Sequence, residues 1–247
     1  MCEGHTSPLC APSRGEPPPM IPLRDENPIT HPPIVTVTLI ILNCLVFLYQ
    51  VSLGPAEERF VLAYAAVPAE LFHLESGIGD PWIPAWMTVF TSMFLHGSWL
   101  HLGGNMLYLW IFGDNIEDVM GHGRYILFYL LTGIVAVFSH AFAAPESTMP
   151  MIGASGAISG VLGAYLLLFP SARVRVLFFF GFFIRTIYVP AAIVLGLWIV
   201  LQVFNAAFNL GGEGGGVAWF AHVGGFLAGL VLIKIFQRPM RAHRLWI

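Results

Sequence analysis

The chain holds a serine and a histidine whose surroundings suit nucleophilic catalysis, although they lie far apart in the sequence. Ser155 stands in the segment MIGASGAISG and His222 in AHVGGFLAG, and each segment opens an apolar run. A serine hydroxyl becomes a nucleophile when a base lies within hydrogen-bond reach, and an imidazole is the commonest such base. Ser155 and His222 are therefore the candidate catalytic pair, provided that the fold brings them together.

A third segment, HGSWLHLGGN, supplies polar groups that can stabilise an oxyanion. His101 and Asn105 are four residues apart, so they share one face of a helix. Together with the backbone N–H of Ser155 at a helix start, their side chains can donate hydrogen bonds to developing negative charge. His96, at the beginning of the segment, is expected to support this group.

The glycines around the two candidate catalytic residues allow a second interpretation, in which these segments serve only helix packing. Small residues such as Gly153, Gly156 and Gly225 permit close backbone contact, and GxxxG spacings begin at the last two. Ser155 would then merely bond back to a carbonyl one turn earlier. An isolated GxSG favours packing, whereas its combination with His222 and the polar third segment favours catalysis.

The composition indicates an integral membrane protein. Of its 247 residues, 57% are hydrophobic and only 10% are charged, and the mean hydropathy is +0.75. A soluble domain of this length carries far more charge. Because a transmembrane helix needs about 20 mostly apolar residues, we predict an all-α bundle of six transmembrane helices: 34–53, 95–112, 125–144, 152–169, 187–208 and 217–236.

The candidate residues lie at a common depth within these spans. At a rise of about 1.5 Å per residue, Ser155 is roughly 5 Å inside its span, His222 roughly 8 Å and His101 roughly 9 Å, all from the outer side. Asn105 lies one turn deeper. Because an unpaired ionisable group at membrane depth is costly, this shared polar layer indicates a functional site below the outer lipid surface.

The positive charges set the expected orientation in the membrane. With both termini inside and six crossings, every Lys and Arg except Arg59 faces the cytoplasm. Five or seven crossings would break this bias. We therefore expect a multi-pass protein of the cell membrane whose N- and C-terminal ends are cytoplasmic.

Three connections between the predicted spans have their own character. The segment 176–184 is strongly apolar but too short to cross, so we interpret it as a cytoplasmic loop that dips into the membrane interface. We expect residues 54–94 to be partly helical and to lie on the outer leaflet. The glycine-rich connection 209–220 is either a mobile cap over the site or an ordinary connector.

The chain is expected to have three parts. Residues 1–33 are rich in proline and lack an apolar core, which predicts a disordered cytoplasmic tail. Residues 34–236 form the six-helix transmembrane domain, and residues 237–247 a basic cytoplasmic tail. The cysteines are too few for a disulfide framework, and no set of four ligands has the usual spacing, so neither a metal nor another cofactor is expected.

The chain resembles the rhomboid intramembrane serine proteases over residues 34–236. The resemblance rests on three motifs taken together: HGSWLHLGGN, GASG, and the AH followed by GxxxG in the last span. The resemblance implies that Ser155 attacks a peptide bond, that His222 acts as general base and then acid, and that His101 and Asn105 line the oxyanion hole. The implied partners are transmembrane protein substrates, cleaved near their outer ends within the lipid bilayer, and no nucleic acid.

The sequence departs from some members of that family in what holds the histidine. No Asp or Glu lies at the depth of His222, which favours a Ser/His dyad over a triad. Some members carry an aromatic residue one turn after the nucleophile, where this chain has Ser159. We hypothesise that the Ser159 hydroxyl holds the second ring nitrogen of His222; alternatively, Ser159 only permits close helix contact.

Two other functions are compatible with the same residues. A transporter or proton channel would use His101, Asn105 and His222 as a polar path, but the inner halves of the spans offer few polar residues to continue it. A non-catalytic relative that only binds membrane proteins would be expected to lack the nucleophile or the base. This chain has both, so catalysis is the preferred interpretation.

Overall fold

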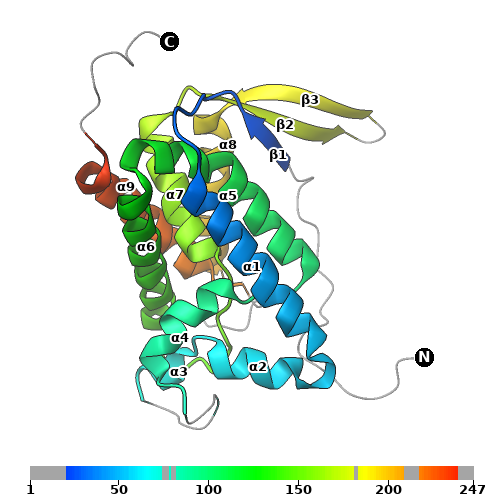
Figure 1. Ribbon diagram of the computed structural model, residues 1–247, viewed down its shortest axis with the longest axis vertical. Coiled ribbons are helices and arrows are strands. Elements are labelled where there is room, and N and C mark those ends of the chain that lie inside the picture. Colours follow the sequence, from blue (N-terminus) through cyan, green and yellow to red (C-terminus); the bar gives the residue numbers. More distant parts are fainter. Residues whose placement is uncertain (1–20, 74–77, 79–81, 181–182, 209–216, 239–247) are drawn as a thin grey trace.

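The computed structural model shows a bundle of long helices with a small sheet at one end (Figure 1). It describes residues 21–73, 78, 82–180, 183–208 and 217–238. The prediction of a mostly helical chain is confirmed for these residues. The long helices of the bundle are α1 (Ile34–Ser52), α5 (Trp99–Met120), α6 (His122–Ala143), α7 (Ser155–Leu168), α8 (Ala191–Phe208) and α9 (Trp219–Phe236).

In the described part of the chain, four helices are long and apolar enough to cross a membrane, namely α1, α6, α8 and α9. The helix α7 has only 14 residues, and α5 carries polar residues near both ends. The predicted limits 95–112 for the second span were wrong, because α5 runs from Trp99 to Met120. Beyond Phe112 the helix carries the buried Glu117, whose carboxylate accepts hydrogen bonds from the backbone N–H groups of Val35 and Thr36 at the start of α1.

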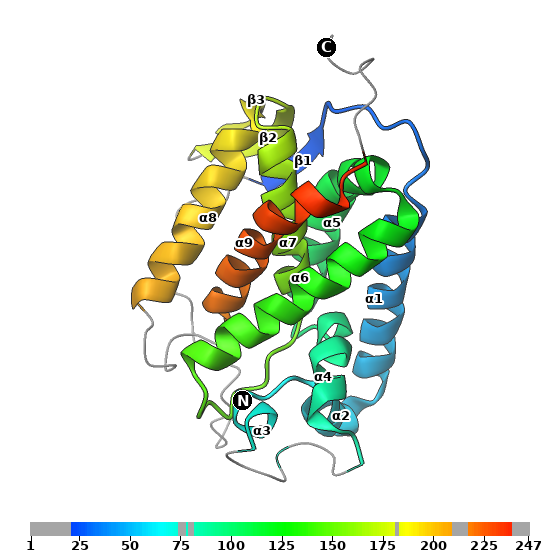
Figure 2. The same ribbon diagram turned by 90° about the vertical axis from the view of Figure 1, so that its left-hand side faces the viewer.

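The helix α7 lies at the centre of the bundle and contacts α5, α6, α8 and α9. Figure 2 shows α9 running beside α7, with α6 and α8 on its two sides. Most apolar side chains of α7 are fully buried, whereas α1 and α8 expose rows of large apolar side chains. Helix surfaces of that kind suit contact with lipid.

Glycines allow α7 and α9 to approach each other closely. A Cβ atom on Gly225 would collide with the carbonyl oxygen of Gly156, and one on Gly229 would collide with that of Gly160. The GxxxG spacings of both helices therefore lie in a single interface. This contact brings the N-terminal half of α9 beside the start of α7.

A three-stranded antiparallel sheet is present, although we expected an all-α fold. Its strands, in the spatial order β1-β2-β3, are β1 (Ile21–Asp25), β2 (Arg173–Phe180) and β3 (Phe183–Pro190). The interpretation of residues 176–184 as a loop was therefore wrong. The buried Val174 and Val176 alternate with the exposed Arg173 and Arg175, and this two-residue period is that of a strand with one covered face.

The N-terminal segment is also partly ordered. Residues 1–20 lie outside the described part of the chain, but β1 pairs with β2, and the Tyr165 hydroxyl donates a 2.6 Å hydrogen bond to Oδ2 of Asp25. Disorder was thus the wrong expectation for residues 21–33. Of the predicted C-terminal tail, residues 239–247 lie outside the described part.

The described part of the connection between α1 and α5 is partly helical, as predicted. It contains η1 (Gly54–Ala56), α2 (Glu57–Tyr64), α3 (Pro68–Leu71), α4 (Ala85–Thr91) and η2 (Ser92–Phe94). Ala66 of this connection exchanges two backbone hydrogen bonds with Met151, at 3.1 and 2.8 Å. The connection thereby holds the segment that leads into α7.

Candidate active site

The structure brings Ser155 and His222 together. Ser155 is the first residue of α7, and His222 lies in the first turn of α9. Nε2 of His222 is 2.8 Å from Oγ of Ser155, which is a direct hydrogen bond. The two residues are 67 positions apart in the chain, so the close α7–α9 interface is what places one within reach of the other.

The start of α7 is fixed by the segment before it. Gly153 has a φ of +120° and donates a 2.9 Å hydrogen bond from its backbone N–H to the carbonyl of Ser92. This left-handed backbone turns the chain so that helical structure begins at Ser155. The first backbone N–H groups of a helix lack partners within the helix, so α7 offers donors and the positive end of its dipole at Ser155.

Two side chains of α8 hold the imidazole of His222. Oε1 of Gln202 lies 2.7 Å from Nδ1 of His222, and the Trp198 ring centroid is 5.9 Å from that of the imidazole. Gln202 is buried. Gln202 was not predicted as part of the site. The signal that the sequence carried was a polar residue within the apolar segment 187–208, one turn after Trp198.

The hypothesis that Ser159 holds His222 was wrong. The Ser159 hydroxyl donates a 2.6 Å hydrogen bond to the backbone carbonyl of Ser155, one turn earlier in the same helix, and Ser159 is fully buried. The second ring nitrogen of His222 bonds Gln202 instead. The aromatic neighbours of the imidazole come from α8, as Trp198, and from α9 itself, as Trp219, and not from α7.

His101 lies against the segment that precedes Ser155. A Cβ atom on Gly153 would lie 2.8 Å from both Cε1 and Nε2 of His101. Nδ1 of His101 is the acceptor for the Gly97 backbone N–H, at 3.3 Å. Because a neutral imidazole that accepts at Nδ1 carries its proton on Nε2, His101 presents an N–H donor toward the start of α7.

Asn105 is held on the same side by His96. The side-chain nitrogen of Asn105 lies 3.0 Å from Nε2 of His96, which leaves a second N–H of the amide for another acceptor. A Cβ atom on Gly153 would be 3.6 Å from that nitrogen. His96 is itself fixed by Gln50 of α1, which donates to its carbonyl at 2.7 Å and accepts from its N–H at 3.3 Å.

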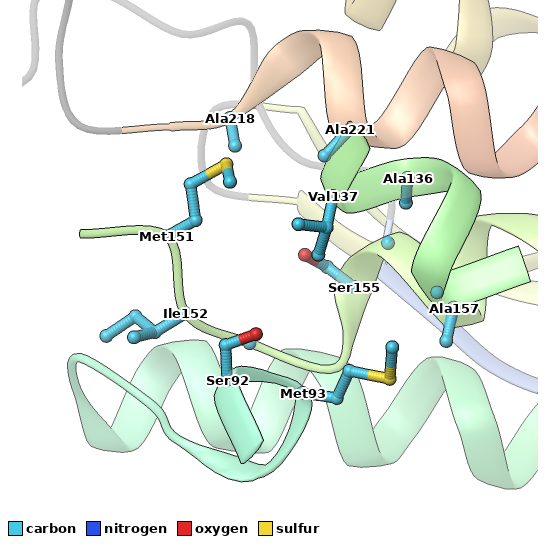
Figure 3. Close-up of a pocket in the computed structure, with 13 residues that line it drawn as sticks. Ser92, Met93, Ala136, Val137, Met151, Ile152, Ser155, Ala157, Ala218 and Ala221 are labelled. Carbon is cyan, nitrogen blue, oxygen red and sulfur yellow. The ribbon is translucent and has the colours of Figure 1, made fainter. Parts of the chain in front are cut away.

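A small cavity of about 30 Å³ opens beside Ser155. Figure 3 shows the Ser155 hydroxyl directed toward it. Its walls are mostly small or apolar side chains: Met93, Ala136, Val137, Met151, Ile152, Ala157, Ala218 and Ala221. Among the residues that the structure describes, no group of three or more His, Cys, Asp or Glu side chains is placed to hold a metal ion.

The chain matches the family model described as the Rhomboid domain over residues 84–239. It is 30% identical over 223 residues to "Rhomboid protein 1, mitochondrial" of Saccharomyces cerevisiae, covering 87% of this chain and 57% of the relative. It is 29% identical over 164 residues to "Rhomboid-like protein 11, chloroplastic" of Arabidopsis thaliana, covering 63% of this chain and 54% of the relative.

A bacterial relative is also similar. The identity to "Rhomboid protease GluP" of Bacillus subtilis is 31% over 209 residues, which cover 84% of this chain and 36% of the relative. The chain thus spans between about a third and three fifths of the length of these curated relatives. The matched residues 84–239 include the α5, α7, α8 and α9 side chains described above.

Proposed function

Because the chain belongs to the rhomboid family, and is therefore an integral membrane protein, we propose that it is an intramembrane serine endopeptidase with Ser155 as nucleophile and His222 as general base. The observation that carries this proposal is the 2.8 Å hydrogen bond between Oγ of Ser155 and Nε2 of His222. The "Rhomboid protease GluP" of Bacillus subtilis shows that the family includes proteases.

The proposed reaction proceeds through an acyl-enzyme. Oγ of Ser155 attacks the substrate carbonyl while Nε2 of His222 takes the hydroxyl proton, and His222 then gives that proton to the leaving amine. Nε2–H of His101, the free amide N–H of Asn105 and the backbone N–H of Ser155 are the proposed oxyanion donors. Water, activated by His222, hydrolyses the ester. The Ser/His pair thus needs no carboxylate partner in this proposal.

The proposed membrane setting has six spans, with α5 and α7 completing the four apolar helices. The 14 residues of α7 reach only about 21 Å, whereas the hydrocarbon core of a bilayer is about 30 Å thick. In this setting the C-terminal end of α7 lies at the inner surface, so its start, and with it Ser155, lies below the outer surface. Both termini are cytoplasmic in this arrangement, and the cell membrane is the proposed location.

The proposed substrates are transmembrane helices cleaved near their outer ends. A helix hides its carbonyls in i to i−4 hydrogen bonds, so the substrate must unwind locally before Ser155 can attack. Residues that weaken a helix lower that cost. The cavity beside Ser155, walled by alanines such as Ala136 and Ala221 and by Val137, suits a small substrate side chain next to the cleaved bond.

Labelling and cleavage together test this function. Detergent-purified protein would be incubated with a serine-directed fluorophosphonate and, separately, with a single-span test substrate. We expect labelling and cleavage by the unaltered chain, and a loss of cleavage of about 10³-fold or more for Ser155→Ala and for His222→Ala. Ser139→Ala is the matched control, because that hydroxyl only bonds back to the carbonyl of Val135 within α6.

Two outcomes would contradict the proposal. Cleavage that survives both Ser155→Ala and His222→Ala would place the reaction elsewhere. A chain that binds the test substrate but neither cleaves it nor reacts with the fluorophosphonate would be the non-catalytic binding relative instead.

A further inference from the structure

We propose that Gln202 is the positioning residue for His222. The site is then a Ser155–His222–Gln202 triad whose third member is neutral and orients the imidazole. This inference rests on the proposed function. It adds to the pair a residue that comes from a different helix, α8, and that the family comparison does not assign.

Both ring nitrogens of His222 are engaged by side chains of different helices. Nε2 faces Oγ of Ser155 on α7 at 2.8 Å, and Nδ1 faces Oε1 of Gln202 on α8 at 2.7 Å. Both distances lie in the range of well-formed hydrogen bonds. Since Oε1 of an amide only accepts, the proton shared with Gln202 must belong to Nδ1.

This bond selects the tautomer that a base needs. With its proton on Nδ1, the neutral imidazole has a lone pair on Nε2 that accepts the Ser155 hydroxyl proton. The opposite tautomer would present an N–H to Ser155 and could not accept. When His222 becomes an imidazolium during the reaction, both ring nitrogens donate, and Oε1 of Gln202 still accepts. Gln202 thus fits the ground state and the charged intermediate.

An amide is well suited to this buried position. Gln202 is 7% exposed, and a carboxylate at such a depth would have to be stripped of water. In the described part of the chain, no Asp or Glu is hydrogen-bonded to His222. The neutral amide supplies direction without a buried charge.

The position of α8 therefore sets the orientation of the base. Trp198, one turn before Gln202, lies with its ring centroid 5.9 Å from that of His222 and 6.2 Å from that of Phe226. The other faces of α8 expose apolar residues such as Val203 and Phe204. A displacement of α8 away from α9 would remove both Gln202 and Trp198 from the imidazole.

Nitrogen NMR of the imidazole, together with steady-state kinetics, tests whether Gln202 positions His222. Histidine would be labelled with ¹⁵N in the full chain in detergent, and the His222 signals assigned by their loss in His222→Ala. For the unaltered chain we expect a protonated Nδ1 and an unprotonated Nε2. Gln202→Met keeps the side-chain length but removes the acceptor, so we expect the Nδ1–H signature to be lost.

Kinetics should separate positioning from binding. For Gln202→Met we expect kcat to fall about 10- to 100-fold while KM stays within about twofold, since an unpaired buried donor weakens the base but not substrate binding. Gln202→Glu restores an oxygen acceptor, and with it the Nδ1–H signature and part of kcat. Val203→Met is the control, because it places the same side chain one residue further along, on the exposed face of α8. It should change neither the Nδ1–H signature of His222 nor kcat.

Three results would overturn the role of Gln202. They are an unchanged His222 spectrum in Gln202→Met, an unchanged kcat in that variant, or a loss of kcat that Gln202→Glu does not reverse at all. Failure of the proposed function would look different, because the unaltered chain would then neither label nor cleave. The NMR spectrum would still test the bond between Gln202 and His222.

Discussion

The carboxylate of Glu117, near the end of α5, holds Thr36 in the first turn of α1. Oε2 of Glu117 accepts hydrogen bonds from the backbone N–H and the hydroxyl of Thr36, at 2.8 and 2.7 Å, and Oε1 accepts from the N–H of Val35 at 2.8 Å. Free N–H groups at a helix start carry partial positive charge, so a buried carboxylate is stabilised there. The two helices are thereby tied at the end of the bundle opposite to Ser155.

Replacing that carboxylate should destabilise the fold without touching the site. Glu117→Gln removes the charge and one acceptor, and we expect a loss of about 2 kcal/mol, or roughly 4–8 °C in the unfolding midpoint. Thermal unfolding in detergent measures the shift of the midpoint. Glu58→Gln, at an exposed position of α2, should leave the midpoint within about 1 °C. Equal midpoints for both variants would contradict the proposed importance of Glu117.

Adding a methyl group between α7 and α9 should damage stability and activity together. A Cβ atom on Gly229 would collide with the backbone oxygen of Gly160, which cannot move aside as a flexible side chain can. We expect Gly229→Ala to cost about 1–3 kcal/mol or more and to reduce cleavage, because Ser155 and His222 are brought together across this interface. Unfolding midpoints and cleavage rates measured in parallel check both effects.

The matched control lies on α8. Gly196 has no atom within 4 Å of the position that a Cβ would take. Gly196→Ala should therefore be neutral or stabilise by up to about 1 kcal/mol, because alanine reduces the freedom of the unfolded chain. If Gly196→Ala and Gly229→Ala behave alike, close α7–α9 contact is not what limits the fold.

The sequence was most informative where a residue type and its spacing determine a local property. The GxxxG spacings at Gly156 and Gly225 predicted a close helix contact, and the structure has that contact. Ser155 and His222, chosen by residue type and estimated depth, lie within hydrogen-bond reach. Their catalytic role stays a prediction, because geometry shows reach and not turnover.

The sequence was least informative where a partner comes from a distant helix. Ser159 was a reasonable candidate for holding His222, because it lies one turn after Ser155, but its hydroxyl bonds within its own helix. Gln202 holds the ring instead, and no spacing links a residue of α8 to one of α9. Similarly, β1 pairs with β2, about 150 residues away, so periodicity within residues 21–33 was too short to reveal it.

The pH dependence of stability should contain a contribution from Asp25. Burial raises the pKa of the Asp25 carboxyl above its ordinary value of 3.8, while the hydrogen bond from Tyr165 opposes that rise in part. A group whose pKa is higher in the folded than in the unfolded chain favours folding at pH values below its unfolded-state pKa. That contribution is lost as the pH rises through the folded pKa.

Comparison with Asp25→Asn isolates this contribution. The amide cannot ionise, so we expect the unfolding midpoint of Asp25→Asn, relative to the unaltered chain, to rise as the pH is increased from about 4 toward neutrality. Thermal unfolding at several pH values measures the difference. A difference that stays constant over this range would contradict a raised pKa at Asp25.

A side chain at Gly153 should impair catalysis more than it impairs folding. The φ of +120° strains any L-residue, and a Cβ atom would lie 2.8 Å from Cε1 and Nε2 of His101, so Gly153→Ala must displace either the turn before Ser155 or the proposed oxyanion donor. Loss of one such donor typically costs about 10²- to 10³-fold in kcat.

The measurement is kcat for a single-span substrate beside the unfolding midpoint. For Gly153→Ala we expect kcat to fall about 100-fold while the midpoint drops by only a few degrees, since one strained residue costs about 1–3 kcal/mol. Gly103→Ala is the control, because a Cβ there meets no atom within 4 Å on the exposed face of α5. Full activity of Gly153→Ala would show that His101 and this turn do not stabilise the oxyanion, because the substitution cannot be accommodated without moving one of them.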